Sequence, residues 1–107
     1  MRRWKEASDV NLDGELVKQI QSIGREYDLK SIILYGSRAT KKNWEKSDID
    51  ICLDIEDTEL YLEVQKAFEE RVRTLLRFDI CNKQRFNYST ALDEEIQRDG
   101  VILYEKV

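Results

Sequence analysis

The chain has no histidine and no proline, and only two of its 107 residues are cysteines. Without histidine it lacks a Ser-His-Asp or Cys-His catalytic group, an imidazole general base and a His-ligated zinc site. Carboxylates must therefore carry any acid–base or metal chemistry. Without proline it has no PxxP segment or Pro-rich linker. Cys52 and Cys81 are too few for a disulfide framework and too far apart for a CxxC site, which favours reduced thiols and a cytoplasmic location.

Long apolar runs are missing as well. No stretch reaches the roughly 18 apolar residues of a membrane span, and no apolar segment follows the basic residues at the start, so we expect no membrane contact and no signal peptide. With 18 basic and 22 acidic residues the net charge is −4, which argues against nucleic-acid binding by phosphate neutralisation. The length suits one small domain over residues 1–107, in which we expect 1–12 to form a mobile N-terminal arm.

Apolar residues recur at helical or alternating spacing along most of the chain. We expect Asp13 to cap the first helix, and Thr90 with Asp93 to cap the last, which Gly100 ends. The predicted order is a helix from 13 to about 28, a strand at 31–35, a polar connection at 38–46, a strand from 47, a helix whose apolar positions run from 60 to 76, a strand at 77–82, a helix from 90 and a strand at 101–104. This order predicts an α/β or α+β domain, with a small mixed sheet flanked by helices.

Three aspartates fall where two strands are predicted. Asp48 and Asp50 project from the same face of one strand, and Asp79 takes an outward position on a strand reached through a helical crossover. Neighbouring strands would bring the three carboxylates together. Such a cluster repels itself unless a divalent cation binds, and all-oxygen ligands favour Mg²⁺. Two ions would suit an in-line phosphoryl or nucleotidyl transfer.

The turn at Gly36 and Ser37 offers a complementary phosphate site. Glycine lets the backbone approach a phosphate closely, serine adds a hydroxyl and an N–H, and a following helix N-terminus adds partial positive charge. Basic residues that could neutralise a polyphosphate follow at once, and we expect Arg38 to be the nearest of them. No Walker A, protein-kinase or Rossmann glycine motif is present.

Together these residues resemble a known pattern. L-Y-G-S-R-A at 34–39, D-I-D-I at 48–51 and F-D-I at 78–80 look like the DNA polymerase beta type nucleotidyltransferase superfamily, and more narrowly like a minimal nucleotidyltransferase. The resemblance covers essentially the whole chain and implies a short mixed sheet flanked by helices. By match of motif, nucleotide phosphates would bind at Gly36, Ser37 and Arg38. The catalytic and metal-binding residues would be Asp48, Asp50 and Asp79.

The resemblance also implies a reaction and a partner. AMP would pass from ATP to a hydroxyl, with Mg²⁺, in two ions, as cofactor. Minimal nucleotidyltransferases occur with helical HEPN-domain proteins, often as antitoxins of RNase toxins. This chain would then AMPylate a tyrosine of such a toxin in a hetero-oligomer, with no direct contact to nucleic acid.

Two other functions stay open at this point. Members of the family often have a glycine shortly after G-S-R-A, whereas Thr40-Lys41-Lys42-Asn43 follows here. The chain could therefore be an inactive binding module that masks its partner. Alternatively, it could transfer a nucleotide to a small molecule such as an aminoglycoside. Both remain alternatives to protein AMPylation.

Overall fold

The computed structural model describes residues 1–5 and 10–107. Within these ranges a five-stranded mixed sheet has the order β1-β5-β2-β3-β4. Strands β2 and β3 pair antiparallel, as do β2 and β5, whereas β4 runs parallel to β3 and β1 parallel to β5. The elements are β1 (Arg2–Arg3), α1 (Gly14–Glu26), β2 (Ser31–Tyr35), α2 (Ser37–Thr40), β3 (Ile49–Leu53), α3 (Thr58–Arg71), β4 (Phe78–Asn82), α4 (Thr90–Asp99) and β5 (Val101–Glu105).

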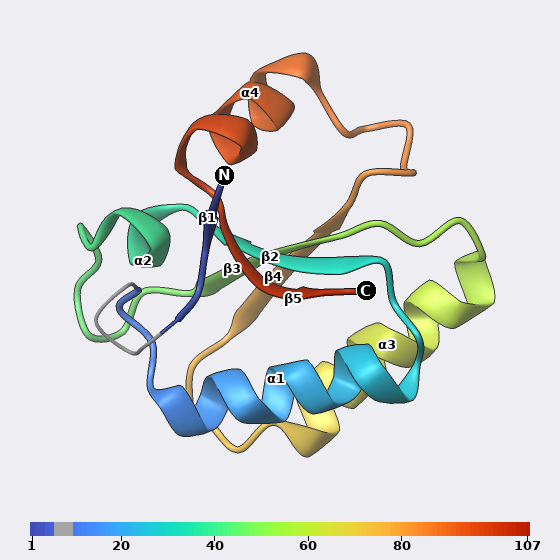
Figure 1. Cartoon of the computed structure of the whole chain (residues 1–107), viewed down its shortest axis with the longest axis horizontal. Helices are drawn as coiled ribbons and strands as arrows, with labels where there is room; N and C mark the ends of the chain where they lie inside the picture. The colour runs from blue at the N-terminus through green and yellow to red at the C-terminus, as the bar shows by residue number, and fades with distance from the viewer. Residues whose placement is uncertain (6–9) are drawn as a thin grey trace.

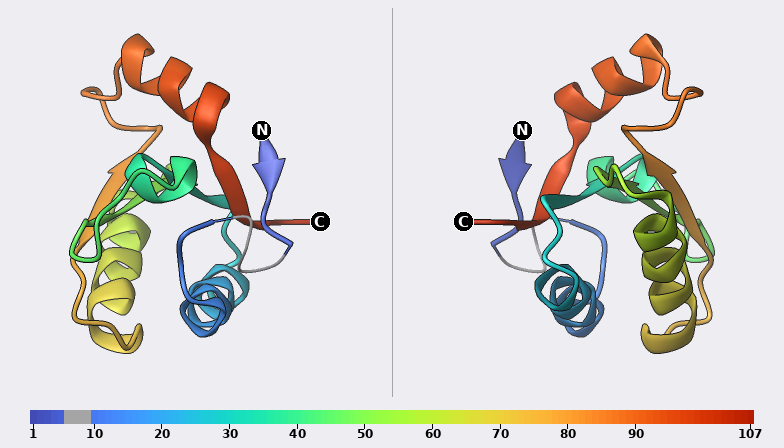
Figure 2. Two further views of the ribbon diagram at one scale, coloured as in Figure 1. Left: turned by 90° about the vertical axis from the view of Figure 1, so that its left-hand side faces the viewer. Right: turned by 90° about the vertical axis from the view of Figure 1, so that its right-hand side faces the viewer.

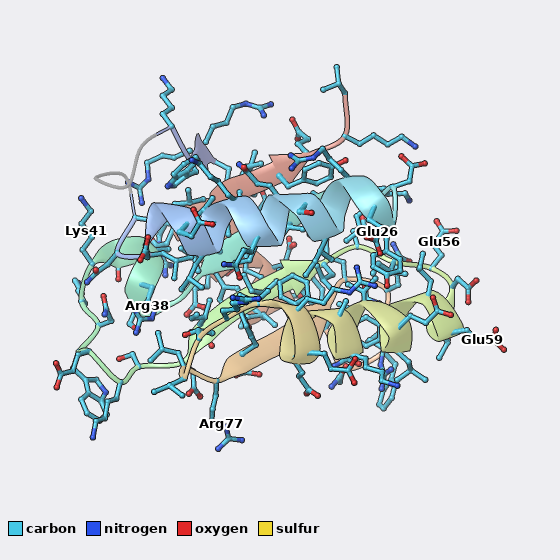
Figure 3. All side chains as sticks on the ribbon, turned by 90° about the horizontal axis from the view of Figure 1, so that it is seen from below. Glu26, Arg38, Lys41, Glu56, Glu59 and Arg77 are labelled. Atoms are coloured by element: carbon cyan, nitrogen blue, oxygen red, sulfur yellow. The ribbon has the colours of Figure 1, made fainter. Side chains whose placement is uncertain are left out.

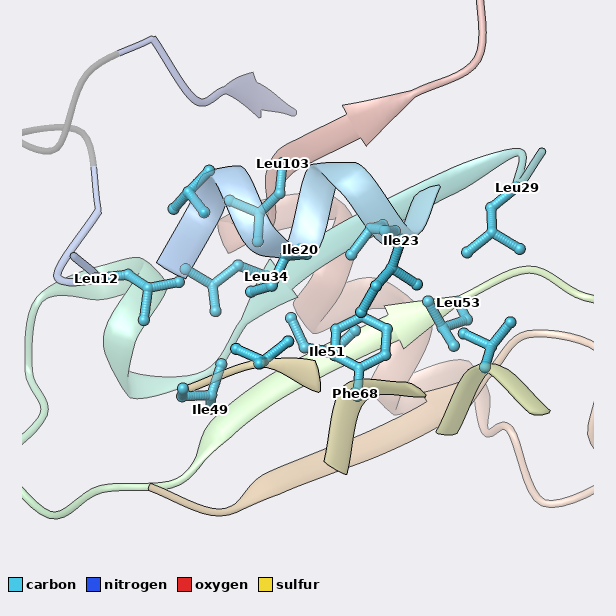
Figure 4. Packing of buried hydrophobic residues seen from close by; sticks show 14 of the residues in the cluster. Leu12, Ile20, Ile23, Leu29, Leu34, Ile49, Ile51, Leu53, Phe68 and Leu103 are labelled. Carbon is cyan, nitrogen blue, oxygen red and sulfur yellow. The ribbon is translucent and has the colours of Figure 1, made fainter. Parts of the chain in front are cut away.

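Helices α1 and α3 cover one face of this sheet, and α4 lies on the other (Figures 1 and 2). The covered face holds the main core, because alternate residues of each strand point into it. Ile51 of β3 and Leu34 of β2 meet Ile20 of α1 and Phe68 of α3 in this core (Figure 4). Phe68 also packs edge-on against Phe78 of β4, with ring centroids 5.2 Å apart.

The second face of the sheet has a smaller core. Ile33, Tyr35 and Cys52 point to this face and pack with Ile96 of α4. One ten-residue helix covers only part of a five-stranded sheet, and Asp79 on β4 stays exposed beside it. The fold thus leaves polar side chains of β3 and β4 open to ligands on this face.

The predicted helices and strands are confirmed in type and order. The Asp13 side chain caps α1, which ends at Glu26, two residues before the predicted end, and Gly100 follows α4 as its C-cap. The predicted cap of α4 is wrong, because Ser89 rather than Thr90 accepts the bond from the Leu92 amide.

Two parts of the helix and strand predictions need correction. Leu75 was assigned to the apolar face of the helix, but α3 ends at Arg71 and Leu75 is fully exposed in the loop that follows. The polar connection contains the one-turn helix α2. The structure also adds β1, which is too short for its sequence to show a period.

The N-terminal segment partly lies outside the described residues, because these omit 6–9. On either side of this gap the chain contacts the domain: Arg2 and Arg3 pair with β5, while Val10 and Leu12 are buried in the main core. That residues 1–12 form a mobile arm stays a prediction. Among the described helices, none has the length and apolar character needed to cross a bilayer.

Candidate functional site

The parallel pairing of β3 with β4 places Asp50 directly opposite Asp79. Since paired residues of neighbouring strands point to the same face, both carboxyl groups lie on the face that α4 leaves partly open. The carboxyl of Asp79 lies close enough for its negative charge to act on Asp50. The structure therefore brings together two of the three aspartates identified in the sequence.

Asp50 is the most perturbed carboxyl group of this site. Burial raises its pKa to about 6, and the negative charges of Asp79, Asp48 and Glu95 add to the effect. Glu95 comes from α4, and no motif in the sequence pointed to it. A half-buried carboxyl group surrounded by three others is the electrostatic environment that a bound cation relieves.

Asp48 lies one residue before β3 begins and is exposed. Its charge acts on Asp50, but no three Asp, Glu or Cys side chains of the described residues are arranged as a set of metal ligands. The predicted convergence of all three aspartates is therefore seen only for Asp50 and Asp79. This pair still fits Mg²⁺, which commonly binds one or two carboxylates and completes its shell with waters and substrate phosphates.

Gly36 lies in close contact with Asp50 of this pair. Its φ of 74° lies in the left-handed region that favours glycine. A β carbon at this position would overlap the Asp50 carboxylate and lie 3.1 Å from its Cγ. Both the backbone conformation and the close approach of Asp50 therefore require glycine, and they hold the turn directly beside the acidic pair.

Ser37 begins the one-turn helix α2 immediately after Gly36. The first amides of a helix have no acceptor within it, so they are available to an anion next to Asp50. Lys41 follows α2 in the left-handed conformation, with φ 61° and ψ 27°. The Lys42 amide donates a hydrogen bond to the Ser37 carbonyl and closes the turn. Thus the loop closes with lysine in a conformation that glycine would adopt more easily.

Arg38 occupies a position that the sequence did not predict. Its side chain is 5% exposed and points into the protein. The guanidinium donates hydrogen bonds to the backbone carbonyls of Ser47, Asn11 and Glu45, over 2.9 to 3.2 Å. Arg38 thereby fixes the loop that leads into Asp48. Direct contact with a phosphate would require it to leave these carbonyls.

Basic side chains lie at the end of the molecule that carries α2. Arg38 and Lys41 lie at this end (Figure 3). Lys42 and Lys46 are exposed in the same 38–46 segment. This acidic chain therefore presents basic groups at the end where the Gly36–Ser37 turn lies.

Tyr35 is a further residue of the site that the motifs did not identify. It is the last residue of β2 and pairs with Asp50. Burial raises the pKa of Tyr35, as do its hydrogen bond with Cys81 and the charges of Asp50 and Asp79, so the phenol stays protonated. Cys81 pairs with the buried Cys52, and both are free thiols. The only signal for Tyr35 was its place just before Gly36.

The fold is similar to solved structures of toxin–antitoxin proteins. One, described as a toxin–antitoxin with AMP-PNP, is 23% identical in sequence and has a TM-score of 0.60. The matched region covers 83% of this chain and 73% of that chain. A mutant of the toxin–antitoxin MntA-HpeT is 21% identical and has a TM-score of 0.59, with the same two coverages. A candidate nucleotidyltransferase from Sulfolobus solfataricus gives 18% and 0.51, over 86% of this chain and 82% of the other. These identities establish a shared fold.

Sequence comparison with curated proteins found no match. By contrast, the family described as polymerase beta nucleotidyltransferase matches residues 18–107. That span contains the Gly36–Ser37 turn, Asp48 and the Asp50–Asp79 pair. The chain therefore belongs to the polymerase beta nucleotidyltransferase family.

Proposed function

We propose that this protein is a metal-dependent nucleotidyltransferase that transfers AMP from ATP to a hydroxyl group of a protein partner. The observation that carries the proposal is the joint position of three groups: Asp50 and Asp79 are opposite each other on β3 and β4, and Gly36 lies against Asp50. The turn that would bind phosphate and the carboxylates that would hold the metal thus lie side by side. The solved toxin–antitoxin structure with AMP-PNP supports a nucleoside triphosphate as the ligand.

The triphosphate would bind at Gly36 and Ser37. The backbone can approach it closely because Gly36 has no side chain, and the Ser37 amide and hydroxyl supply hydrogen bonds. Lys42 and Lys46 add positive charge at this end of the molecule. Arg38 would contribute by holding the loop in place, through its bonds to the backbone carbonyls.

Asp50 and Asp79 would hold Mg²⁺, with Asp48 as a further ligand, and the family pattern implies two ions. When bound, these ions neutralise charge on the triphosphate and lower the pKa of an attacking hydroxyl. Asp50 must be ionised to act as a ligand, and its pKa of about 6 leaves it mostly ionised at neutral pH. The raised pKa therefore makes binding of the ions dependent on pH.

Transfer would proceed by in-line displacement. The acceptor oxygen bonds to the α-phosphorus, the bond from that phosphorus to the bridging oxygen breaks, and pyrophosphate leaves. Asp79 is the exposed carboxylate of the pair and is positioned to take the hydroxyl proton. Gly36 and Ser37 would hold the departing pyrophosphate.

The acceptor would be a tyrosine on a HEPN-domain toxin, with this chain acting as the antitoxin in a cytoplasmic hetero-oligomer. Two similar solved structures are toxin–antitoxin proteins, which supports a toxin partner. The chain also exposes large apolar side chains on loops, as partner-binding surfaces do: Trp44, Leu75 and Phe86.

The test is transfer of radiolabel to the purified product of the adjacent gene. Label in the α-phosphate of ATP should appear on the partner, and label in the γ-phosphate should not. Asp50→Asn should abolish transfer, whereas Asp54→Asn, which removes the same charge outside the acidic pair, should leave it intact. Equal labelling by the wild type and Asp50→Asn would refute the proposal.

A second candidate function is inhibition of the partner by binding alone. The exposed Trp44 and Phe86 favour it, because they suit a docking surface whether or not the site is active. Binding of ATP separates the two functions, since a masking module need not bind it. Calorimetry with Mg²⁺ and ATP should show binding to the wild type and weaker binding to Asp50→Asn; no binding to either would favour masking.

A further inference from the structure

A pocket of about 380 Å³ lies beside Asp79, along β4 at the edge of the sheet. Its walls come from three regions far apart in the sequence: β2, α3, and the stretch that runs from β4 through the following loop into α4. Several of its side chains are aromatic, and one is cationic. The residues that matter here are Tyr35, Tyr61, Asp79, Arg85, Asn87 and Tyr88.

The order of the strands places this pocket on one side of the reaction. The Gly36–Ser37 turn follows β2, Asp50 lies on the next strand β3, and Asp79 on the edge strand β4. An in-line displacement requires the attacking oxygen to approach opposite the leaving group. If pyrophosphate leaves on the Gly36 side, the acceptor must arrive on the Asp79 side, where the pocket lies.

The lining of the pocket indicates the chemistry of its occupant. The ring of Tyr88, which is only partly buried, suits a flat side chain, since aromatic groups pack favourably against each other. The guanidinium carbon of the exposed Arg85 lies 5.5 Å from the centroid of the Tyr61 ring, which holds the cation at the pocket. An exposed arginine with a planar fork of donors is suited to bind a carboxylate.

We propose that this pocket receives the acceptor: a phenolic side chain on an acidic segment of the partner protein, with a carboxylate of that segment bound by Arg85. The inference rests on the proposed function and adds to it the acceptor site and the charge of the sequence around the acceptor. The phenolic oxygen bonds to the α-phosphorus, its proton passes to Asp79, and pyrophosphate leaves toward Gly36.

The alternative occupant is the nucleoside of ATP, because Tyr88 and Arg85 could stack on adenine. The two occupants differ in which affinity depends on Arg85. If the pocket is the acceptor site, substituting Arg85 weakens binding of the partner and leaves the affinity for ATP unchanged. If it is the nucleoside site, the substitution weakens binding of ATP and leaves the affinity for the partner unchanged.

The experiment measures two affinities of the same variants by calorimetry. One titration uses Mg²⁺ and ATP, and the other uses the purified product of the adjacent gene. The variants are Arg85→Glu and Arg85→Lys, which keeps the positive charge. Lys18→Glu on α1 is the control, since it makes the same change in charge at an exposed position that does not line the pocket. Kinetics then give the KM for each substrate.

Arg85→Glu should weaken binding of the partner and raise its KM by at least about tenfold, because reversing a charge at an ion-pair contact costs at least that much affinity. The affinity for ATP should change less than about twofold. Arg85→Lys keeps the charge but not the planar fork, so it should bind the partner better than Arg85→Glu and less well than the wild type. Weaker binding of ATP, or partner binding equal to that of Lys18→Glu, would overturn the inference. Loss of transfer in the wild type, with the Arg85 effect on partner binding intact, would instead refute the proposed function alone.

Discussion

Gly36 and Asp50 are in direct contact: the turn after β2 lies so close to the carboxylate on β3 that no other residue type fits there. Position 36 is therefore fixed both by its φ of 74° and by the side chain opposite. The contact joins the Gly36–Ser37 turn to the acidic pair without any intervening group. A change on either side should consequently disturb both.

Gly36→Ala should lower the free energy of unfolding by about 1–3 kcal/mol, because alanine is strained at positive φ and its β carbon displaces Asp50. The rate of adenylyl transfer should fall by about 10²-fold, since displacing a catalytic group by 1 Å costs that much. The matched control is Gly14→Ala at the start of α1, where a β carbon meets nothing within 4 Å. Urea denaturation that gives the same stability for both variants would contradict this reading.

Asp50 should make stability depend on pH in metal-free buffer. Its folded pKa of about 6 exceeds the ordinary value of 3.8, so the folded state binds the proton more tightly. The resulting stability is fully present below about pH 4 and is lost as the pH rises through 6.

Asp50→Asn removes this dependence. We expect the free energy of unfolding of the variant to exceed that of the wild type by about 1–2 kcal/mol at pH 8. This is less than the full pKa shift would give, because the side chain is only half buried. Denaturation in EDTA from pH 4 to 8 measures the difference, with Asp54→Asn as the control. A difference between Asp50→Asn and the wild type that stays constant over this range would show that Asp50 does not titrate as described.

The sequence predicted most of the fold because periodicity reports which face of an element is buried. Alternation also placed Asp50 and Asp79 on the outward faces of their strands, but only the parallel pairing of β3 with β4 puts them opposite each other. It could not predict the position of Arg38, because a basic side chain in a polar segment is normally solvated and only the tertiary fold supplies three carbonyls around it. Glu95 and Arg85 lie outside the motifs, and only the packing of α4 and the loop before it brings them to the site.

Arg38→Met tests the structural role of this side chain. The substitution removes the hydrogen bonds to three backbone carbonyls, so the free energy of unfolding should fall by about 2–4 kcal/mol. Arg25→Met, on an exposed position of α1, should change it by less than about 0.5 kcal/mol. Unchanged stability of Arg38→Met, together with weaker binding of ATP, would instead support the phosphate contact that the sequence suggested.

Lys41 offers a test of the loop that departs from the family pattern. Its left-handed conformation costs about 1–2 kcal/mol for a residue with a β carbon. Glycine avoids this strain, but part of the benefit is offset because glycine loses more conformational entropy on folding. Lys41→Gly should therefore be more stable than Lys41→Ala by about 0.5–1 kcal/mol. Because both variants lack the lysine side chain, the comparison isolates the backbone conformation. Thermal denaturation that shows Lys41→Ala to be the more stable variant would show that the backbone is not strained.

The most direct test of adenylyl transfer is the intact mass of the adjacent gene's product after co-expression with this protein. With the wild type, the partner should carry one or more adenylyl groups. With Asp50→Asn or Asp79→Asn, it should have its unmodified mass and still co-purify. A partner that is unmodified with the wild type, or modified equally with all three forms, would contradict transfer by the Asp50–Asp79 pair.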